Sequence, residues 1–441
     1  MDRKRISEII GLIHKEVKPA LGCTEPIAVA LAVAKAMEIL EDRCGCRTSG
    51  WRMDANPDIS VEVSGNILKN GMGVGIPGTG MVGLHIASAL GAVCGKTEYG
   101  LEVLHDLNPE AIEKAKELVS GGKVRVGLAD TGHKLFVKAN VSLSEGHKAS
   151  ALIEDDHDNI VETWFDDIVL NKSVSSTEDA QEDKSTRDYG LTVREILEFA
   201  DTVPFEDIRF ILESRDLNLA LAKEGLASSY GLRVGHTILS EKYRQVFGSD
   251  FMSYAMAMTA AASDARMAGC TLPAMSNSGS GNQGITVTMP VIAYSLKYDV
   301  NDEQLARALV LSHLVAIHIK GYLGKLSALC GCVIASTGAA CGIVYLRGGT
   351  YGQICAAIKN MIGNITGMVC DGAKVGCALK VASGVSCALQ SAVLAMEGIC
   401  ISENDGIIEK DIEKTIRNLG EIGSKGMQTT DNMILDIMVC K

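Results

Sequence analysis

The chain has 441 residues, of which 47% are apolar, so it is long enough to bury two or three hydrophobic cores. Its 54 acidic residues outnumber its 42 basic ones, which gives a formal net charge of −12, and no basic stripe interleaved with aromatic residues is present. This composition lacks the electrostatic footprint of a nucleic-acid-binding protein and favours work on small molecules.

Residues 1–44 predict two helices, over 6–18 and 25–40. The first residues are charged and then amphipathic, without the apolar core and cleavage site of a secretory signal, so we expect a cytoplasmic protein. The second helix follows Leu21-Gly22-Cys23, with Thr24 as its predicted cap and Pro26 in its first turn. A helix N-terminus lowers the pKa of a nearby thiol, which makes Cys23 a candidate base or nucleophile. The alternative is that Cys23 only fills space after Gly22.

Residues 45–172 predict a small α/β domain of short strands and helices. Strands are expected at 59–63, 124–127, 135–139, 151–153 and 160–163, and helices near 81–93 and 109–119. The run Gly73-Val-Gly-Ile-Pro-Gly78 matches the dinucleotide-binding pattern G-x-G-x-x-G. Because the preceding strand ends too early and Pro77 interrupts the turn, we favour a tight loop near a site over nucleotide binding.

Residues 173–190 are predicted to be an exposed linker, since the surrounding stretch is polar and low in complexity. Residues 191–441 then read as a helical catalytic domain, with helices near 192–200, 204–223, 250–268, 301–318, 352–362 and 409–417. The predicted fold class is therefore α+β, with the smaller α/β domain inserted and the helices of 1–44 packing on the catalytic domain. The uncharged run 326–346 is rich in small residues, which favours a buried helix over a membrane span.

Four of the fourteen cysteines, Cys330, Cys332, Cys370 and Cys377, lie among glycines in the last third of the chain. Grouped thiolates in a reducing compartment bind metals more often than they form disulfides. Cys370 and Cys377 are seven residues apart, and Gly372 and Gly376 would allow the segment to wrap around one centre. From the residues alone an iron-sulfur cluster, a zinc site and plain buried thiols all stay open.

A second glycine-rich loop, residues 276–284, carries Asn277, Asn282 and Gln283. It lacks the ending of a P-loop, so a triphosphate site is not expected. Its amide donors suit a substrate carboxylate, and a solvated turn is the alternative reading. Lys374, between the two later cysteines, is a further predicted substrate contact.

Four segments together resemble the L-cysteine desulfidase family, which is related to the iron-sulfur L-serine dehydratase alpha chains. They are Gly22-Cys-Thr-Glu-Pro-Ile-Ala28, the Ser-Gly-Ser-Gly-Asn-Gln-Gly loop, Leu329-Cys-Gly-Cys332 and the segment from Met368 to Lys380. The match runs through nearly the whole chain. It implies a 4Fe-4S cluster with one open iron site, and no pyridoxal phosphate, eliminating sulfide from L-cysteine to give pyruvate and ammonia.

By this resemblance the cluster ligands are Cys330, Cys370 and Cys377, with Cys332 in reserve for Cys330, and Cys23 is the general base. Where the serine dehydratases carry a Ser-Ser-His-Thr type motif, this chain has Gly22-Cys-Thr-Glu. That difference favours a thiol leaving group, while L-serine dehydration and a non-enzymatic iron-sulfur or zinc sensor remain alternatives. The implied partner is an amino-acid substrate, without nucleic acid or membrane, and a homo-oligomer is compatible with the sequence. This prediction requires that Cys23 and the later cysteines meet in one pocket.

Overall fold

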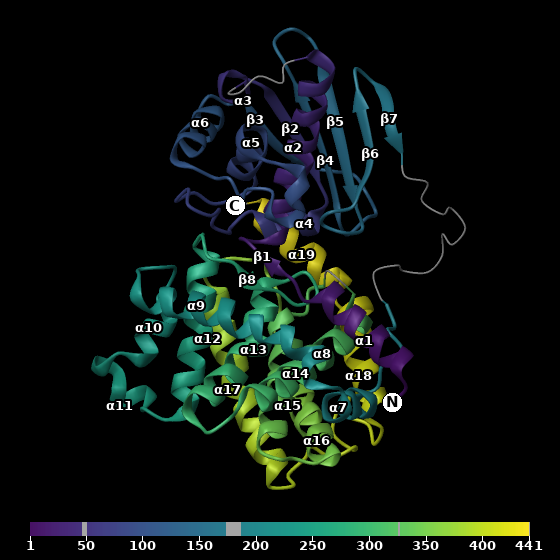
Figure 1. Ribbon diagram of the computed structural model, residues 1–441, viewed down its shortest axis with the longest axis vertical. Helices are drawn as coiled ribbons and strands as arrows, with labels where there is room; N and C mark the ends of the chain where they lie inside the picture. Colours follow the sequence, from purple (N-terminus) through teal and green to yellow (C-terminus); the bar gives the residue numbers. More distant parts are fainter. Residues whose placement is uncertain (46–50, 173–186, 325–326, 441) are drawn as a thin grey trace.

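The computed structural model describes residues 1–45, 51–172, 187–324 and 327–440, and it has an upper and a lower unit (Figure 1). The upper unit is a sheet covered by helices, and the lower unit is almost entirely helical. The predicted fold class, α+β and mainly helical, is thus confirmed. Of the predicted linker 173–190, only residues 187–190 lie within the described residues.

The upper unit is built on a six-stranded sheet with the strand order β3-β2-β4-β5-β6-β7. Strands β2 and β3 run parallel and the other neighbouring pairs run antiparallel. Side chains on one face are buried and those on the other half-exposed, the alternation that the sequence predicted. Only β7 was missed, because this edge strand buries none of its residues and so shows no alternation. The strands are β2 (Asp58–Val63), β3 (Val124–Leu128), β4 (Phe136–Ser142), β5 (Lys148–Glu154), β6 (Ile160–Phe165) and β7 (Ile168–Lys172).

The buried face of this sheet is covered by α2 and α5, with α6 packed on α5. The side chains of α2 are apolar on nearly every face, and almost all of its length is buried. We expected residues 1–44 to pack on the catalytic domain, but α2 belongs to the core of the upper unit and only α1 packs on the lower one. The helices of this unit are α2 (Thr24–Cys44), α3 (Trp51–Asp54), α4 (Gly65–Gly71), α5 (Leu84–Cys94), the 3-10 turn η1 (Thr97–Glu102) and α6 (Pro109–Ser120).

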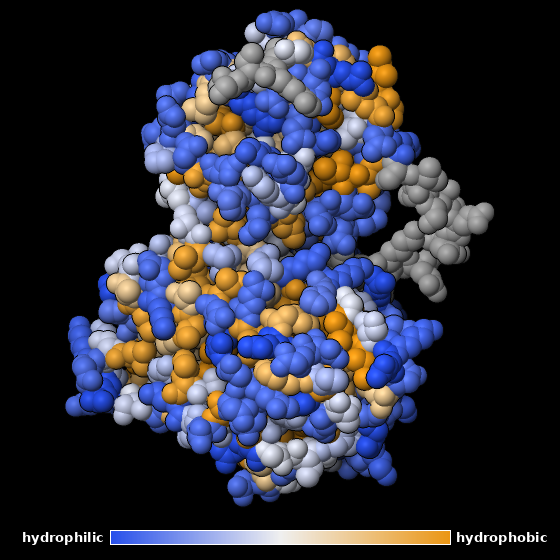
Figure 2. Space-filling model, viewed as in Figure 1, coloured by the Kyte–Doolittle hydropathy of each residue, from blue (hydrophilic) through white to orange (hydrophobic). Residues whose placement is uncertain are grey.

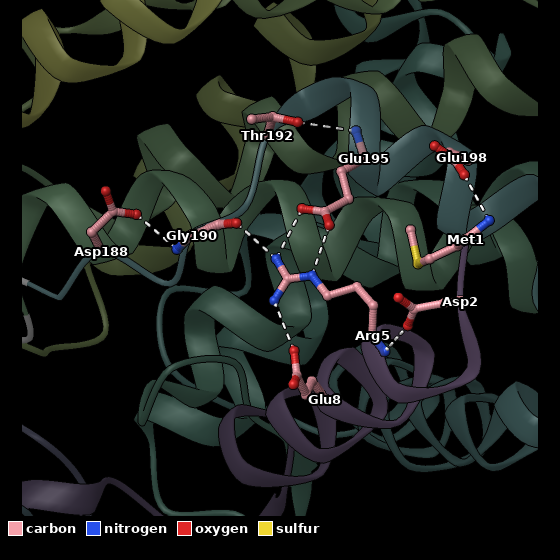
Figure 3. A network of polar contacts seen from close by, with 9 residues as sticks. All are labelled: Met1, Asp2, Arg5, Glu8, Asp188, Gly190, Thr192, Glu195 and Glu198. Carbon is pink, nitrogen blue, oxygen red and sulfur yellow. Dashed lines mark hydrogen bonds and ion pairs between the residues drawn. The ribbon is translucent and has the colours of Figure 1, made fainter.

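Helix α1 (Arg3–Glu16) is fixed to the lower unit by the polar network in Figure 3. The Arg5 guanidinium donates to both carboxylate oxygens of Glu195, at 2.7 and 2.9 Å, and to the Gly190 carbonyl at 2.7 Å. The terminal amine of Met1 pairs with Glu198 at 2.9 Å. Both carboxylates come from α7 (Val193–Thr202), so the network joins the first helix to the first helix after the linker.

The lower unit packs its helices around α15 (Gly331–Leu346), which contacts α13, α14, α16 and α17. This helix lies within the predicted uncharged run and is buried, as expected. Gly338 has no room for a side chain, since a Cβ there would meet the Ser312 carbonyl of α14. The neighbouring helices are α12 (Phe251–Met267), α13 (Gly281–Lys297), α14 (Asp302–Leu323), α16 (Tyr351–Ile365) and α17 (Cys377–Met396).

The remaining elements of the lower unit flank this bundle, and all of them except α9 are shorter than its helices. The predicted helix 204–223 is broken into three pieces, α8, η2 and α9. Among the described residues one helix, α17, is long and apolar enough to cross a membrane, but half of its apolar window is buried, as in a core helix. The flanking elements are α8 (Phe205–Ile208), η2 (Arg209–Leu212), α9 (Glu213–Ala227), α10 (Val234–Leu239), η3 (Glu241–Tyr243), α11 (Arg244–Phe247), α18 (Ile412–Glu421) and η4 (Ile422–Gly426).

Several short backbone contacts hold the two units together at a seam. Strand β1 (Pro19–Ala20) pairs antiparallel with β8 (Ala274–Met275), between α1 and α2 on one side and α12 and α13 on the other. The Gly75 amide donates to the Met267 carbonyl at 2.9 Å, and a Cβ at Gly75 would lie 2.5 Å from the Ala268 carbonyl carbon. Gly75, the second glycine of the G-x-G-x-x-G match, therefore permits close backbone packing against the end of α12, which fits the expected tight loop.

The C-terminal helix α19 (Gln428–Val439) returns from the lower unit to the upper one and lies between them in Figure 1. Asp431 of this helix accepts from Asn66 at 2.7 Å and forms an ion pair with Lys69, and both partners are in α4. The Lys69 side chain is only 2% exposed, so this ion pair is largely shielded from solvent.

Most of the face shown in Figure 2 mixes polar and apolar residues. Apolar atoms gather at the edge of the upper unit, over β7, where Ile168 is 66% and Val169 is 49% exposed. Scattered exposed apolar residues are ordinary on proteins, so this face by itself identifies no partner.

Candidate active site

A cavity of about 130 Å³ lies at the seam, and residues of both units line it. Seven of the residues that the sequence singled out meet there, so the predicted convergence is present in the structure. They are Cys23, Asn282, Gln283, Cys330, Cys332, Cys370 and Cys377.

Cys330 and Cys370 are brought together by a short antiparallel bridge between Leu329 and Val369. The Cys330 amide donates to the Met368 carbonyl at 3.0 Å, and the Cys370 amide donates to the Ala328 carbonyl at 2.7 Å. The two thiols share a hydrogen bond, which lowers the pKa of Cys370 to about 6 and raises that of Cys330. Cys370 is therefore the thiolate of the pair at neutral pH, and Cys330 is the donor.

Cys377 and Cys332 approach the cavity from two helix N-termini. Cys377 is the first residue of α17, and its sulfur lies 3.7 Å from the Gly372 carbonyl. Cys332, in the first turn of α15, donates its thiol hydrogen to the Lys380 carbonyl at 3.2 Å, and burial raises its pKa to about 12. Within the Cys-Gly-Cys pair, Cys332 is thus turned to the backbone of α17 while Cys330 is paired with Cys370.

Cys23 comes from the upper unit and occupies the N-cap position of α2, so Thr24 is not the cap as predicted. The Thr24 hydroxyl instead donates to the Gly279 carbonyl at 2.9 Å. Burial raises the pKa of Cys23 to about 12, although the Arg266 guanidinium beside it lowers the value in part. The predicted low pKa is therefore wrong, because desolvation of a thiolate that is only 3% exposed outweighs a helix terminus.

Behind the cavity, a chain of buried polar side chains fixes Gln283. Its amide nitrogen donates to Asn277 Oδ1 at 2.6 Å, and Asn277 Nδ2 donates to His313 at Nδ1, 2.9 Å away, and at the backbone carbonyl, 3.3 Å away. Burial lowers the pKa of His313 to about 3, so the ring is neutral and can accept this bond. Asn277 does not line the cavity, so the predicted direct contact of Asn277 with substrate is not supported.

Three cations line the cavity, and sequence reasoning found none of them. The Arg266 guanidinium donates to the Gly22 carbonyl at 2.8 Å and lies 3.4 Å from Asn282 Oδ1. Lys380 donates to the Val369 carbonyl at 2.8 Å and pairs with Asp371. Lys320 has no hydrogen bond or ion pair to any described residue, and burial lowers its pKa to about 8. The missed signal was the placement of Arg266 and Lys320 at the ends of long uncharged runs, residues 251–263 and 308–319.

The predicted substrate contact Lys374 does not line the cavity. Its amine is 3.1 Å from the Asp371 carbonyl and forms an ion pair with the Asp371 side chain. Burial raises the pKa of Asp371, but the hydrogen bonds from Lys374 and Lys380 outweigh it and bring the pKa to about 2. Lys374 therefore stabilises the loop before α17, and Lys380 faces the cavity in its place.

Among the described residues no three His, Cys, Asp or Glu side chains are close enough to hold a single metal ion. A mononuclear zinc site of three or more such ligands is therefore not formed by this part of the chain. In a cubane cluster each cysteine binds a different iron, so the ligands surround a space rather than one point. Three cysteines around a small cavity suit the second arrangement better.

A larger cavity of about 620 Å³ adjoins the first. Both cavities are lined by Glu25, Ser280 and Lys320, so these three residues form a neck between them.

The chain matches the family described as serine dehydratase alpha chain over residues 98–436. It is 50% identical to a UPF0597 protein of Phocaeicola vulgatus over 98% of this chain and 97% of that protein. It is also 50% identical to a UPF0597 protein of Oleidesulfovibrio alaskensis, over 99% of this chain and 98% of the relative, and 44% identical to one of Shewanella halifaxensis, over 97% of each. The chain therefore belongs to the serine dehydratase alpha chain family and, within it, is related over its full length to the UPF0597 proteins.

Proposed function

We propose that this protein is an iron-sulfur-dependent lyase that eliminates sulfide from L-cysteine, giving pyruvate, ammonia and hydrogen sulfide. Membership of the serine dehydratase alpha chain family supports β-elimination as the type of reaction. The observation that carries the finer proposal is the cavity in which Cys23 meets Cys330, Cys370 and Cys377.

The chemistry of the donors fits a 4Fe-4S cluster held by Cys330, Cys370 and Cys377. Cys370 already has a lowered pKa, with Lys69 and Lys380 among the causes, so one ligand is ready as a thiolate. Cys332 is committed to the Lys380 carbonyl, which favours Cys330 as the third ligand. When bound, the cluster would supply an open iron as Lewis acid for the leaving thiolate, and soft iron suits a soft sulfur ligand.

Cys23 is the proposed general base, which takes the α-proton of the substrate on its sulfur. Its raised pKa means that the thiol form predominates at neutral pH, and the Arg266 guanidinium is the neighbour that stabilises the thiolate. Loss of sulfide from the deprotonated substrate leaves aminoacrylate, which water converts to pyruvate and ammonia. Because Cys23 is only 3% exposed, little bulk water competes with its sulfur for this proton.

L-Serine is the second candidate substrate, since the family description names serine dehydratase. The deciding experiment is anaerobic purification with reconstitution of iron and sulfide, followed by addition of L-cysteine or L-serine. We expect a brown protein that releases sulfide and pyruvate in equal amounts from L-cysteine and forms pyruvate more slowly from L-serine. Pyruvate from L-serine alone would make the chain a serine dehydratase, and a brown protein inert to both would make it a sensor. A colourless protein with stoichiometric zinc would refute the cluster.

A further inference from the structure

Three polar groups of the cysteine cavity have no hydrogen-bond partner among the described residues: Gln283 Oε1, Arg266 Nε and the Lys320 amine. Gln283 is 2% exposed, and its Oε1 has no hydrogen-bond partner among the described residues. Lys320 is half-buried and likewise forms no hydrogen bond or ion pair with a described residue. Leaving such groups unpaired costs free energy, so their retention in one cavity points to a ligand with a matching donor and anion.

The orientation of the Gln283 amide is fixed by a backbone group, which can only accept. The His313 carbonyl is 3.3 Å from Asn277 Nδ2, so the Asn277 amide presents its nitrogen to His313 and its oxygen to Gln283. Gln283 must therefore donate with its nitrogen, and Oε1 is left as an acceptor beside the cavity. We had expected this loop to donate to a carboxylate, but its free atom suits an ammonium group.

Lys320 differs from the other two cations of the cavity, each of which donates to a backbone carbonyl. Arg266 binds the Gly22 carbonyl, and Lys380 binds the Val369 carbonyl and Asp371. Lys320 also lines both cavities, at the place where they adjoin. Cys370, Cys330, Glu25 and Glu16 act on the Lys320 amine only through space, so its N–H groups stay available to an anion.

We propose that the cavity recognises an α-amino acid by its two charged ends, with Lys320 binding the carboxylate and Gln283 Oε1 accepting from the ammonium group. This inference rests on the proposed function for the identity of the site. Both groups of the ligand are on one carbon atom, which suits a cavity of about 130 Å³ lined by both residues. Asn277 and His313 are then positioning residues, which act on the substrate only through Gln283.

The test uses the reconstituted holoprotein and two truncated ligands, with binding measured by calorimetry. 3-Mercaptopropionate lacks the ammonium group, cysteamine lacks the carboxylate, and both keep the thiol. Lys320→Met should weaken 3-mercaptopropionate about 10- to 100-fold and leave cysteamine within about twofold, because one charged hydrogen bond is lost. Gln283→Met should show the reverse pattern.

Lys18→Met is the matched control, because Lys18 lines only the larger cavity and the change in net charge is the same. It should change neither affinity by more than about twofold, since a charge outside the cavity is screened. Lys320→Arg keeps the cation and should retain most of the affinity for 3-mercaptopropionate. Equal weakening of both ligands by Lys320→Met, or no weakening, would overturn the assignment. A third result is that the protein binds as expected, with Lys320→Met weakening only 3-mercaptopropionate and Gln283→Met weakening only cysteamine, and yet fails to turn over L-cysteine. That result would support this inference and reject the proposed reaction.

Discussion

The two units contribute to the cavity in different ways. In the lower unit, Cys330 and Cys370 are positioned relative to each other by a local bridge between Leu329 and Val369. The loop that follows Cys370 contacts the upper unit through a bridge between Gly73 and Lys374. In the upper unit, Cys23 begins a helix whose core packing is elsewhere, and it reaches the cavity only because the seam holds the units together. Binding of a cluster and turnover should therefore respond differently to mutations in the two units.

The largest expected effect is from Cys370→Ser in the lower unit. Loss of the thiolate with the lowered pKa should remove both the visible absorbance of the reconstituted protein and all measurable turnover. Cys332→Ser is the matched control, because the Cys332 thiol is bonded to the Lys380 carbonyl, and this variant should stay brown. If Cys332→Ser were colourless and Cys330→Ser brown, Cys332 would be the cluster ligand in place of Cys330.

Cys23→Ser should distinguish most clearly between cluster binding by the lower unit and turnover, which also needs the upper unit. We expect the iron content and colour to stay at the wild-type level while kcat/KM falls about 100- to 10,000-fold, the usual loss when a general base is removed. Iron analysis and sulfide release on the same preparation check both parts. Parallel loss of iron would mean that Cys23 is a ligand, and unchanged turnover would mean that it is not the base.

The pH dependence should report the same residue. Because burial raises the pKa of Cys23 to about 12, the thiolate fraction increases about tenfold for each pH unit below that value. The kcat/KM for L-cysteine should therefore rise about tenfold per pH unit between about pH 6 and pH 7.5. Above about pH 8 it should level off, because Lys320, whose pKa burial lowers to about 8, then loses the charge that is proposed to bind the substrate carboxylate. A profile that is flat between about pH 6 and pH 7.5, with the protein intact, would show that another group takes the proton.

Opening the seam should have a smaller effect. In Gly75→Ala the new Cβ would lie 2.5 Å from the Ala268 carbonyl carbon, so we expect a loss of about 1–3 kcal/mol in the free energy of unfolding and a fall in turnover with the colour retained. Gly132→Ala is the control, because no heavy atom lies within 4 Å of a Cβ at Gly132. Equal behaviour of the two variants in denaturant titrations would contradict the close packing at the seam.

The smallest effect concerns His313 and acid stability. Its pKa is lowered from 6.5 to about 3 by burial, so the unfolded chain binds one more proton than the folded one between these values. The contribution of His313 to the free energy of unfolding is therefore fully present above about pH 6.5. Below that pH it falls by about 1.4 kcal/mol per pH unit. In His313→Gln the free energy of unfolding should depend less steeply on pH by that amount. An unchanged slope would show that other groups cause the acid sensitivity.

Local patterns in the sequence predicted much of the fold. The alternation in β2 to β6 and the apolar helix α2 were recognised, because burial on one face or all around leaves a direct trace in the residues. Helices α13 and α17 were not, since their small residues and glycines permit tight packing but carry weak helical periodicity. The assignment of α2 to the wrong unit has the same origin, because a helix buried all round does not show which neighbour covers it.

For the site, the sequence by itself determined which thiols and amides belong together, because Cys23, Asn282, Gln283 and the later cysteines stand in short unusual motifs. Only the tertiary structure decided which of them face the cavity and in what state. Burial raises the pKa of Cys23 to about 12. The His313 carbonyl fixes the orientation of the Asn277 amide, which leaves Gln283 Oε1 as the acceptor at the cavity. Asp371 pairs with Lys374, whereas Lys320 has no hydrogen-bond partner among the described residues. These outcomes depend on desolvation and on neighbours distant in the chain, neither of which a local motif encodes.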